Sequence, residues 1–107
     1  MKRYDICIAR LEPVQGSEMG KTRPVVIVSD DLRNQLLQTV VVCPLTSQLH
    51  PAWRSRLQVR CAGHAAEIAV DQIRVLSRAR LTRKIAQLSA AEAESLRQLI
   101  SEMYGKP

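Results

Sequence analysis

The chain contains no phenylalanine, and its aromatic residues are one tryptophan and two tyrosines among 107 residues. This scarcity argues against a surface that binds nucleic acid by stacking a row of bases. Cysteine is also scarce and odd in number, since Cys7, Cys43 and Cys61 are widely spaced. Neither a disulfide framework nor a zinc site is predicted, and we interpret the three as small core residues in a reducing compartment.

The sequence has no apolar run of membrane-spanning length, for which about 18 to 20 residues are needed. It begins with a basic segment that leads directly into a strand-like run, without the apolar stretch of a signal peptide. His50 and His64 stand apart from clustered acids or thiols, so no metal site and no cofactor are expected. We therefore expect a cytoplasmic protein without a membrane segment.

Basic residues outnumber acidic ones by 16 to 10, which gives a formal net charge of +6. Lysine and arginine neutralise phosphates and release counterions, so the charge favours a polyanionic partner. A basic surface that only serves solubility is the alternative. The length suits one compact domain covering residues 1–107.

Alternating and apolar segments predict several short strands followed by one helix. The capping-box pattern Ser89 to Glu92, with apolar residues at helical spacing after it, predicts an amphipathic helix over about residues 89–104. The strands together predict a small, strongly curved sheet or barrel over about residues 4–88. The expected strands are residues 4–11, 24–29, 39–43, 57–60, 67–70, 71–76 and 81–88, with a turn or short helix over 30–38.

A polar loop punctuated by Gly16 and Gly20 ends in Arg23, and Pro24 then opens an apolar strand. The guanidinium carries five donors in a rigid fork that matches phosphate oxygens, and it stays charged at physiological pH. Arg23 is therefore a candidate for holding a phosphodiester during a reaction. A salt bridge to a carboxylate at a hairpin end explains the residue equally well.

A second polar loop opens with Thr46 and Ser47, directly after an apolar segment. If the strands next to the two loops are neighbours, the Arg23 guanidinium and the Thr46 hydroxyl converge and can hold a scissile phosphate. A turn or capping pair is the plainer interpretation of Thr46 and Ser47. Ser17 and Glu18 suit ribose binding or proton transfer, or a hydrogen bond within their own loop.

Two further groups of residues each allow more than one interpretation. Trp53 beside Arg54 and Arg56 suits the stacking of one base, or a tryptophan that folds its loop onto the barrel. Gln72 and Arg74 share one face of an expected strand. That face lines a groove, faces solvent or lies in a dimer interface.

Five segments in order resemble the MazF/PemK toxins of prokaryotic toxin–antitoxin modules: residues 3–5, 13–18, 20–27, 44–48 and 71–74. The resemblance runs over nearly the whole chain. It implies a mainly β fold, a small SH3-like barrel of the plasmid-maintenance-toxin type with a C-terminal helix. It also implies a homodimer whose groove binds single-stranded RNA, an endoribonuclease activity that needs no metal, and a cognate antitoxin protein.

The resemblance also implies roles for individual residues. Arg23 and Thr46 match the catalytic arginine and threonine of the family, and the loop that matches Gly16, Ser17 and Glu18 lines the RNA groove. In the implied reaction, the ribose 2′-hydroxyl attacks the adjacent phosphorus of mRNA and leaves a 2′,3′-cyclic phosphate and a 5′-hydroxyl. The base preference is expected in residues 48–64, where the resemblance thins. The other residues expected to bind RNA are Lys21, Ser47, Gln48 and Gln72.

Tyr4 departs from the family pattern, in which a glycine usually stands between the opening arginine and aspartate. The departure leaves Arg23 and Thr46 untouched. Two other functions stay open from the sequence: a toxin of the same barrel that inhibits DNA gyrase without cleaving RNA, and a plain interaction module.

Overall fold

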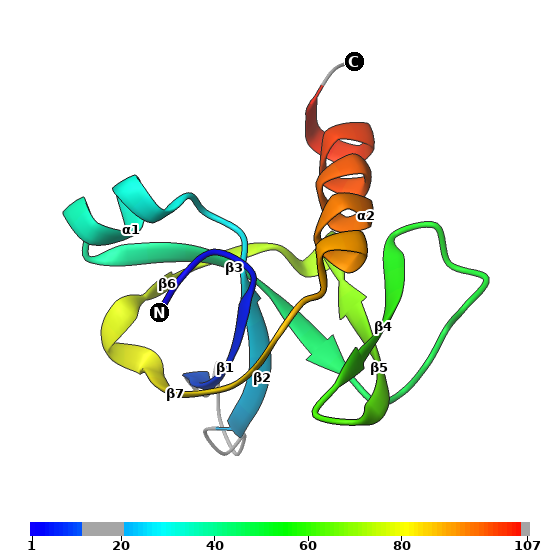
Figure 1. The fold of residues 1–107 in the computed structure, drawn as a ribbon, viewed down its shortest axis with the longest axis horizontal. Helices are drawn as coiled ribbons and strands as arrows, with labels where there is room; N and C mark the ends of the chain where they lie inside the picture. Colours follow the sequence, from blue (N-terminus) through cyan, green and yellow to red (C-terminus); the bar gives the residue numbers. More distant parts are fainter. Residues whose placement is uncertain (12–20, 106–107) are drawn as a thin grey trace, which may run out of the picture.

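The computed structural model describes residues 1–11 and 21–105, which form a curved antiparallel sheet followed by a helix (Figure 1). The predicted class, mainly β with a C-terminal helix, is confirmed. The strands are β1 (Asp5–Leu11), β2 (Lys21–Ile27), β3 (Thr39–Thr46), β4 (Arg56–Cys61), β5 (His64–Ala69), β6 (Arg74–Ser77) and β7 (Leu81–Gln87). The helices are α1 (Asp31–Leu36) and α2 (Ala90–Ile100), with short 3₁₀ turns η1 (Val70–Gln72) and η2 (Arg78–Arg80) and a π-helical end η3 (Ser101–Gly105).

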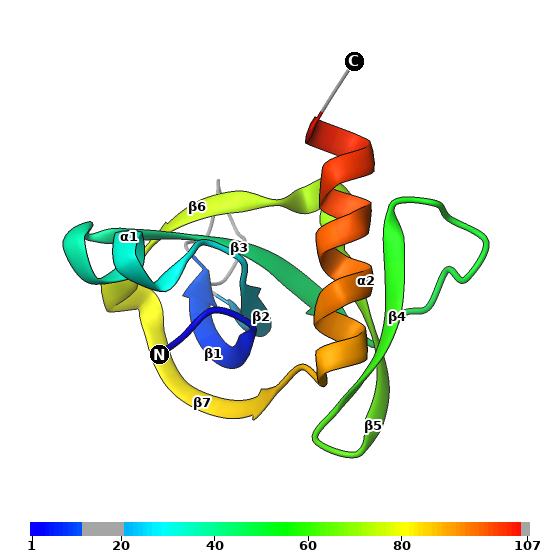
Figure 2. The ribbon, with the colours of Figure 1, turned by 45° about the horizontal axis from the view of Figure 1, so that its top comes forward.

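The sheet follows the order β4-β5-β3-β2-β1-β7, and β6 also pairs with β3. Because η2 connects β6 directly to β7, the run β6-β3-β2-β1-β7 curls back on itself, as the turned view shows (Figure 2). The hairpin of β4 and β5 leaves this curl at the far end of β3. The sheet therefore has the strong curvature that the short strands predict.

The core lies on both faces of the central strands, which explains why their sequences are apolar at consecutive positions. Ile6 and Cys7 are neighbours in β1, and both are fully buried in different hydrophobic clusters. The three cysteines are buried and unpaired, as predicted for core residues. Burial raises the pKa of the Cys43 thiol to about 12, so this thiol stays protonated at neutral pH.

Four strands are longer than the sequence suggested. Strands β4 and β5 each have two residues more than expected, and β2 and β3 extend past prolines that were interpreted as strand boundaries. Strand β2 begins at Lys21, before Pro24, and β3 continues through Pro44 to Thr46. Arg23 and Thr46 therefore lie within strands rather than in loops. The paired backbone of a strand holds a residue more firmly than a loop does. A proline is tolerated in a strand where no partner needs its missing N–H group.

The expected strand over residues 71–76 is wrong in its first part. The Ile73 N–H donates to the Val70 carbonyl at 3.2 Å and closes the turn η1, so β6 begins only at Arg74. Gln72 therefore does not share a strand face with Arg74, although both side chains line one cavity described below.

Helix α2 begins with the predicted capping box. The Ser89 N–H donates to Glu92 Oε1 at 2.9 Å, and the Glu92 N–H donates to Ser89 Oγ at 3.1 Å. Glu92 also accepts the Arg60 N–H at 3.0 Å, which ties the start of the helix to β4. On the inner face, Ala93 and Leu96 are buried against the sheet.

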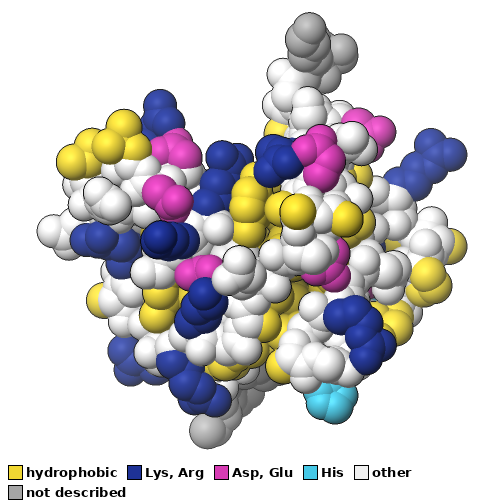
Figure 3. Space-filling view, viewed as in Figure 1, with side chains coloured by type: hydrophobic (Ala, Val, Ile, Leu, Met, Phe, Trp, Pro, Cys, Tyr) yellow, Lys and Arg dark blue, Asp and Glu magenta, His cyan; other side chains and the backbone are white. Residues whose placement is uncertain are grey.

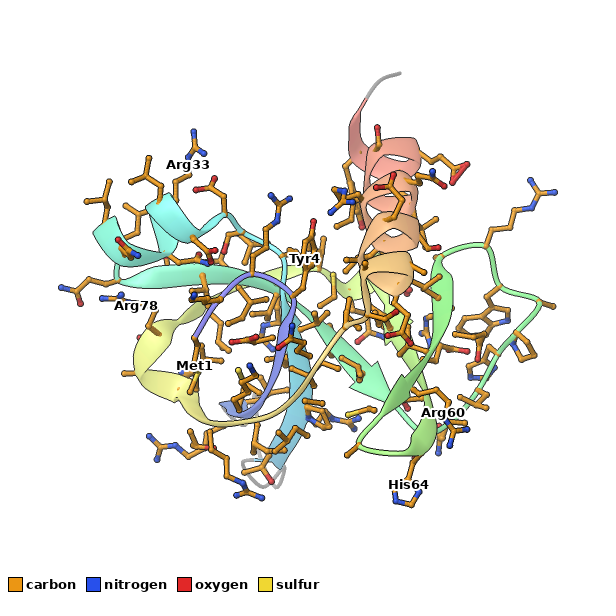
Figure 4. The ribbon with its side chains drawn as sticks, in the orientation of Figure 1. Met1, Tyr4, Arg33, Arg60, His64 and Arg78 are labelled. Carbon is orange, nitrogen blue, oxygen red and sulfur yellow. The ribbon has the colours of Figure 1, made fainter. Side chains whose placement is uncertain are left out.

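Tyr4 has a φ angle of +72°, a left-handed conformation that glycine adopts without strain. This explains why a glycine suits the position. The tyrosine compensates through two contacts with Arg97 of α2: its hydroxyl accepts from Arg97 Nη1 at 3.1 Å, and the Arg97 guanidinium carbon lies 5.6 Å from the ring centroid (Figure 4). The guanidinium carbon of the neighbouring Arg3 lies 5.0 Å from the same centroid. Tyr4 therefore links the N-terminal segment to the C-terminal helix.

Replacing Tyr4 by alanine is expected to destabilise the protein more than replacing it by glycine. Both variants lose the ring contacts, but alanine keeps the strained φ angle, so we expect it to be the less stable by about 0.5–1 kcal/mol. Urea unfolding followed by far-UV circular dichroism measures the difference. An alanine variant as stable as the glycine variant would show that the left-handed angle imposes no strain.

Candidate active site

Strands β2 and β3 are antiparallel neighbours, with Val25 opposite Pro44. Continuing this register by two residues sets Arg23 opposite Thr46. Both residues line the same two adjoining cavities, of about 290 Å³ and about 650 Å³. The structure thus brings together the guanidinium and the hydroxyl that the sequence suggested as a pair.

We call these two cavities together the cleft, since they also share Leu45 and Gln48. The smaller cavity adds residues from β1, β4, β5, η1 and β6 and from the loop between β3 and β4. The larger cavity extends along β5 toward the β4–β5 turn. There His64 lies at the tip of the hairpin (Figure 4). The polar residues found only in the smaller cavity are His50, Arg56, Gln72 and Arg74, and those found only in the larger one are Thr22, Ser47 and His64.

Of the residues expected to bind RNA, Ser47, Gln48 and Gln72 thus line the cleft. Lys21 is the first residue of β2, two positions before Arg23. The expectations for Gly16, Ser17 and Glu18 fall outside the described residues.

The Arg23 side chain is half-buried, and its guanidinium makes no hydrogen bond or ion pair with residues 1–11 or 21–105. The salt bridge considered as its alternative role therefore has no carboxylate partner in this part of the chain. Arg74 is likewise without an ion pair there. Two guanidiniums that no described carboxylate compensates line the smaller cavity, which favours an anionic ligand.

The Thr46 hydroxyl accepts the Gln48 N–H at 3.1 Å, which is the turn that the sequence allowed. A hydroxyl accepts through its lone pairs and donates through its own proton. The turn therefore orients the Thr46 oxygen and leaves its proton available for a ligand oxygen in the cleft.

Glu67 is fully buried on β5 and organises the loop between β3 and β4. Its Oε2 accepts from Arg56 Nη1 at 2.7 Å, and its Oε1 accepts from Gln58 Nε2 at 2.6 Å and from the His50 backbone N–H at 2.5 Å. Arg56 also donates through Nε to Asp71 at 2.8 Å. One carboxylate thus joins β4, β5 and the loop, and Arg56 extends the network to η1.

This network keeps both carboxylates ionised. Burial alone raises the pKa of Glu67, but the hydrogen bonds from Gln58, His50 and Arg56 outweigh it and hold that pKa below its usual 4.5. Burial acts in the same direction on Asp71, and the hydrogen bond from Arg56 again leaves the pKa below its ordinary value.

Trp53 is already engaged by protein groups. Its ring stacks on the His50 ring with a centroid distance of 3.9 Å and an interplanar angle of 9°, and the Arg56 guanidinium carbon lies 4.6 Å from its centroid. His50 lines the smaller cavity, whereas Trp53 is in the lining of neither cavity. The contacts favour the interpretation in which Trp53 folds its loop onto the barrel over the one in which it stacks on a base.

The sequence pattern predicted no role for Glu67, and it placed His50 only within residues 48–64, the segment expected to set the base preference. One signal for Glu67 was present: it is the single charged residue in the otherwise apolar segment of residues 65–70. A carboxylate in a buried strand needs partners, and those partners come from other parts of the chain.

Within residues 1–11 and 21–105, no group of three or more histidine, cysteine, aspartate or glutamate side chains is placed to hold a metal ion. The helices in the same part of the chain are too short or too polar to cross a membrane.

Comparison with known proteins gives a consistent set of relatives. The family model of PemK-like, MazF-like toxins of type II toxin–antitoxin systems matches residues 2–104. The chain is 33% identical over 110 residues to Endoribonuclease MazF of Staphylococcus saprophyticus, covering 98% of this chain and 92% of that protein. It is 34% identical over 93 residues to Endoribonuclease EndoA of Bacillus subtilis, covering 82% and 80%.

A MazE-MazF crystal structure from Deinococcus radiodurans matches with a TM-score of 0.85 and 20% identity, over 100% of this chain and 97% of that one. At this identity the likeness shows the fold alone.

Glu67→Gln is expected to change how stability depends on pH. Because the pKa of Glu67 is lowered by folding, its ionised form stabilises the protein above about pH 4.5, and this contribution is lost as the pH falls through the lowered value. The variant should therefore be less stable at pH 7 by about 2 kcal/mol, and the difference should shrink toward pH 3.

Urea unfolding between about pH 3 and pH 7 measures both curves. Glu102→Gln, at the exposed end of the C-terminal helix, is the matched control and should follow the wild-type profile. Parallel curves for wild type and Glu67→Gln would contradict the assigned role of the buried carboxylate.

Proposed function

The chain belongs to the PemK-like, MazF-like toxins of type II toxin–antitoxin systems, and from this membership we propose that it is an endoribonuclease that cleaves single-stranded RNA. Two relatives that share about a third of its residues carry the name endoribonuclease. The single observation that carries the proposal is the placement of Arg23 and Thr46 in one cleft.

The proposed reaction is a transesterification within the RNA. The 2′-hydroxyl oxygen attacks the adjacent phosphorus, the bond from phosphorus to the 5′-oxygen breaks, and the products carry a 2′,3′-cyclic phosphate and a 5′-hydroxyl. Negative charge builds up on the phosphoryl oxygens on the way to the transition state. The Arg23 fork stabilises that charge, and the Thr46 hydroxyl donates to a non-bridging oxygen.

We propose that this reaction needs no metal ion. Arg23 and Arg74 bring two positive charges to the smaller cavity, and neither is neutralised by a carboxylate within the described ranges. Guanidiniums held on strands are preorganised, so they stabilise a phosphorane without a large rearrangement.

Sequence selectivity is proposed to come from the polar residues around the reacting phosphate. Gln48 and Gln72 each offer donors and acceptors to base edges, and Ser47 adds a hydroxyl to the larger cavity. The Watson–Crick edges of bases are open only where the bases are unpaired, which favours single-stranded mRNA as the substrate. Gly16, Ser17, Glu18 and Lys21 remain proposed RNA contacts on the strength of the family resemblance.

The proposed partners are a cognate antitoxin and a second copy of the chain in the cytoplasm. A structure titled MazE-MazF, and another titled as an endoribonuclease with its cognate antitoxin, share the fold. The net charge of +6 suits an acidic antitoxin segment. Leu32, Leu36 and Leu37 on and beside α1 are exposed at 66%, 73% and 50%, and Figure 3 shows an apolar patch over α1 that suits burial in a homodimer.

The test is incubation of the purified protein with a mixed RNA pool in EDTA. We expect cleavage, with 5′-hydroxyl ends detected by their failure to ligate until phosphorylated. Arg23→Ala and Thr46→Val should each lose about 10²-fold or more in rate, because each removes a donor to the transition state. Arg83→Ala on β7 removes the same charge at an exposed position that lines neither cavity, and it should cleave at the wild-type rate.

Absence of cleavage by the wild-type protein, or wild-type rates for Arg23→Ala, would falsify the proposed function. If the protein fails to cleave RNA but inhibits DNA supercoiling, the gyrase-inhibiting alternative gains support instead.

A further inference from the structure

The proposed reaction requires the 2′-hydroxyl to lose a proton, and neither Arg23 nor Thr46 is suited to accept it. A guanidinium stays protonated at neutral pH, and an unassisted hydroxyl is too weak a base. Among the described residues that line the smaller cavity, His50 is the one whose side chain type exchanges protons readily near neutrality.

His50 is held in place without the use of its ring nitrogens. Its backbone N–H donates to Glu67 at 2.5 Å, its carbonyl accepts the Trp53 N–H at 2.9 Å, and its ring stacks on Trp53 at 3.9 Å. No hydrogen bond joins either ring nitrogen to the part of the chain that the structure describes. The ring is therefore oriented by its surroundings and free to accept a proton.

His50 lines the same small cavity as the two residues proposed to hold the phosphate. About 290 Å³ is lined by Arg23, Thr46 and His50 together, and a volume at the small end of ligand pockets leaves room for little more than one nucleotide. A phosphate held by Arg23 and Thr46 thus brings its own ribose into the part of the cavity where His50 lies.

We propose that His50 is the residue that accepts the 2′-hydroxyl proton, and that Glu67 and Trp53 are positioning residues for it. The inference rests on the proposed function. The proton moves from the 2′-oxygen to an imidazole nitrogen while that oxygen forms its bond to phosphorus. The 5′-oxygen leaves as its bond to phosphorus breaks and takes a proton from water, and His50 then returns its proton to solvent.

The other charged groups around this site keep their charge near neutral pH. Arg56 from β4 is paired with Glu67 from β5 and Asp71 from η1, and both carboxylates have pKa values below their ordinary range. Among the residues that the structure describes, the remaining charged side chains of the cavity are the guanidiniums of Arg23 from β2 and Arg74 from β6. A change of rate with pH near neutrality therefore reports on histidine.

The experiment measures single-turnover cleavage of a single-stranded RNA oligonucleotide from about pH 5 to pH 9. For wild type, the rate should rise with pH along an acid limb. His50→Gln should lose about 10²-fold or more in rate and should lose that limb. Added imidazole should restore cleavage to His50→Gly. His64→Gln removes the other histidine and should keep the limb, whatever its rate.

Binding of an oligonucleotide with 2′-deoxyribose at the cleavage site separates chemistry from folding. His50→Gln should bind this uncleavable RNA analogue within a few-fold of wild type. Glu67→Gln and Trp53→Leu should cleave more slowly but keep the acid limb, because the proton acceptor is still present.

An acid limb and a near wild-type rate in His50→Gln would overturn the assignment to His50, and so would a loss of rate that only follows lost binding. Either result leaves the proposed function intact if wild-type cleavage still depends on Arg23. If wild type cleaves no RNA, the proposed function fails and the assignment fails with it.

Discussion

The arrangement of the molecule depends on the pairing of β3 with three other strands. One edge of β3 pairs with β2. The other edge pairs with β6 up to Val42 and with β5 from Leu45 onward. Pro44 lies where the pairing of this edge passes from β6 to β5, and it has no N–H group to donate to a neighbouring strand. Beyond it, Leu45 and Thr46 lie where the two parts of the sheet separate, and a cavity opens on either side of them. The site is thus a consequence of how the sheet divides.

A second constraint is the burial of Glu67, which determines the part of the cleft formed by the loop between β3 and β4. An ionised carboxylate is costly to bury unless all its partners are in place. Arg56, Gln58 and the His50 backbone meet that requirement in the conformation that the loop between β3 and β4 adopts here. The requirement therefore fixes a loop that has no regular strand or helix of its own, and with it the position of His50.

Sequence patterns predicted the features that depend on residues close together in the chain. The Ser89 capping box, the helix after it and the buried strands follow from residues close together in the sequence. The convergence of Arg23 and Thr46 needed only the assumption that two apolar strands are neighbours. The Glu67 contact with His50 spans 17 positions and the Tyr4 contact with Arg97 spans 93, and no local pattern encodes such pairs. The ends of β2 and β3 were misplaced because a proline ends a strand only where its N–H is needed.

The arginines that line the smaller cavity have two different roles, one structural and one in binding an anion. Neighbouring carboxylates determine which role each arginine has. Arg56 lies between Glu67 and Asp71, its side chain is only 7% exposed, and its charge is compensated within the fold. Arg23 and Arg74 line the same cavity and have no such partner among residues 1–11 and 21–105. A polyanion entering the cleft gains most beside the uncompensated pair, which directs a phosphate toward Thr46 rather than toward the structural arginine. The placement of the acids, as much as that of the arginines, therefore determines which part of the cleft suits the proposed RNA substrate.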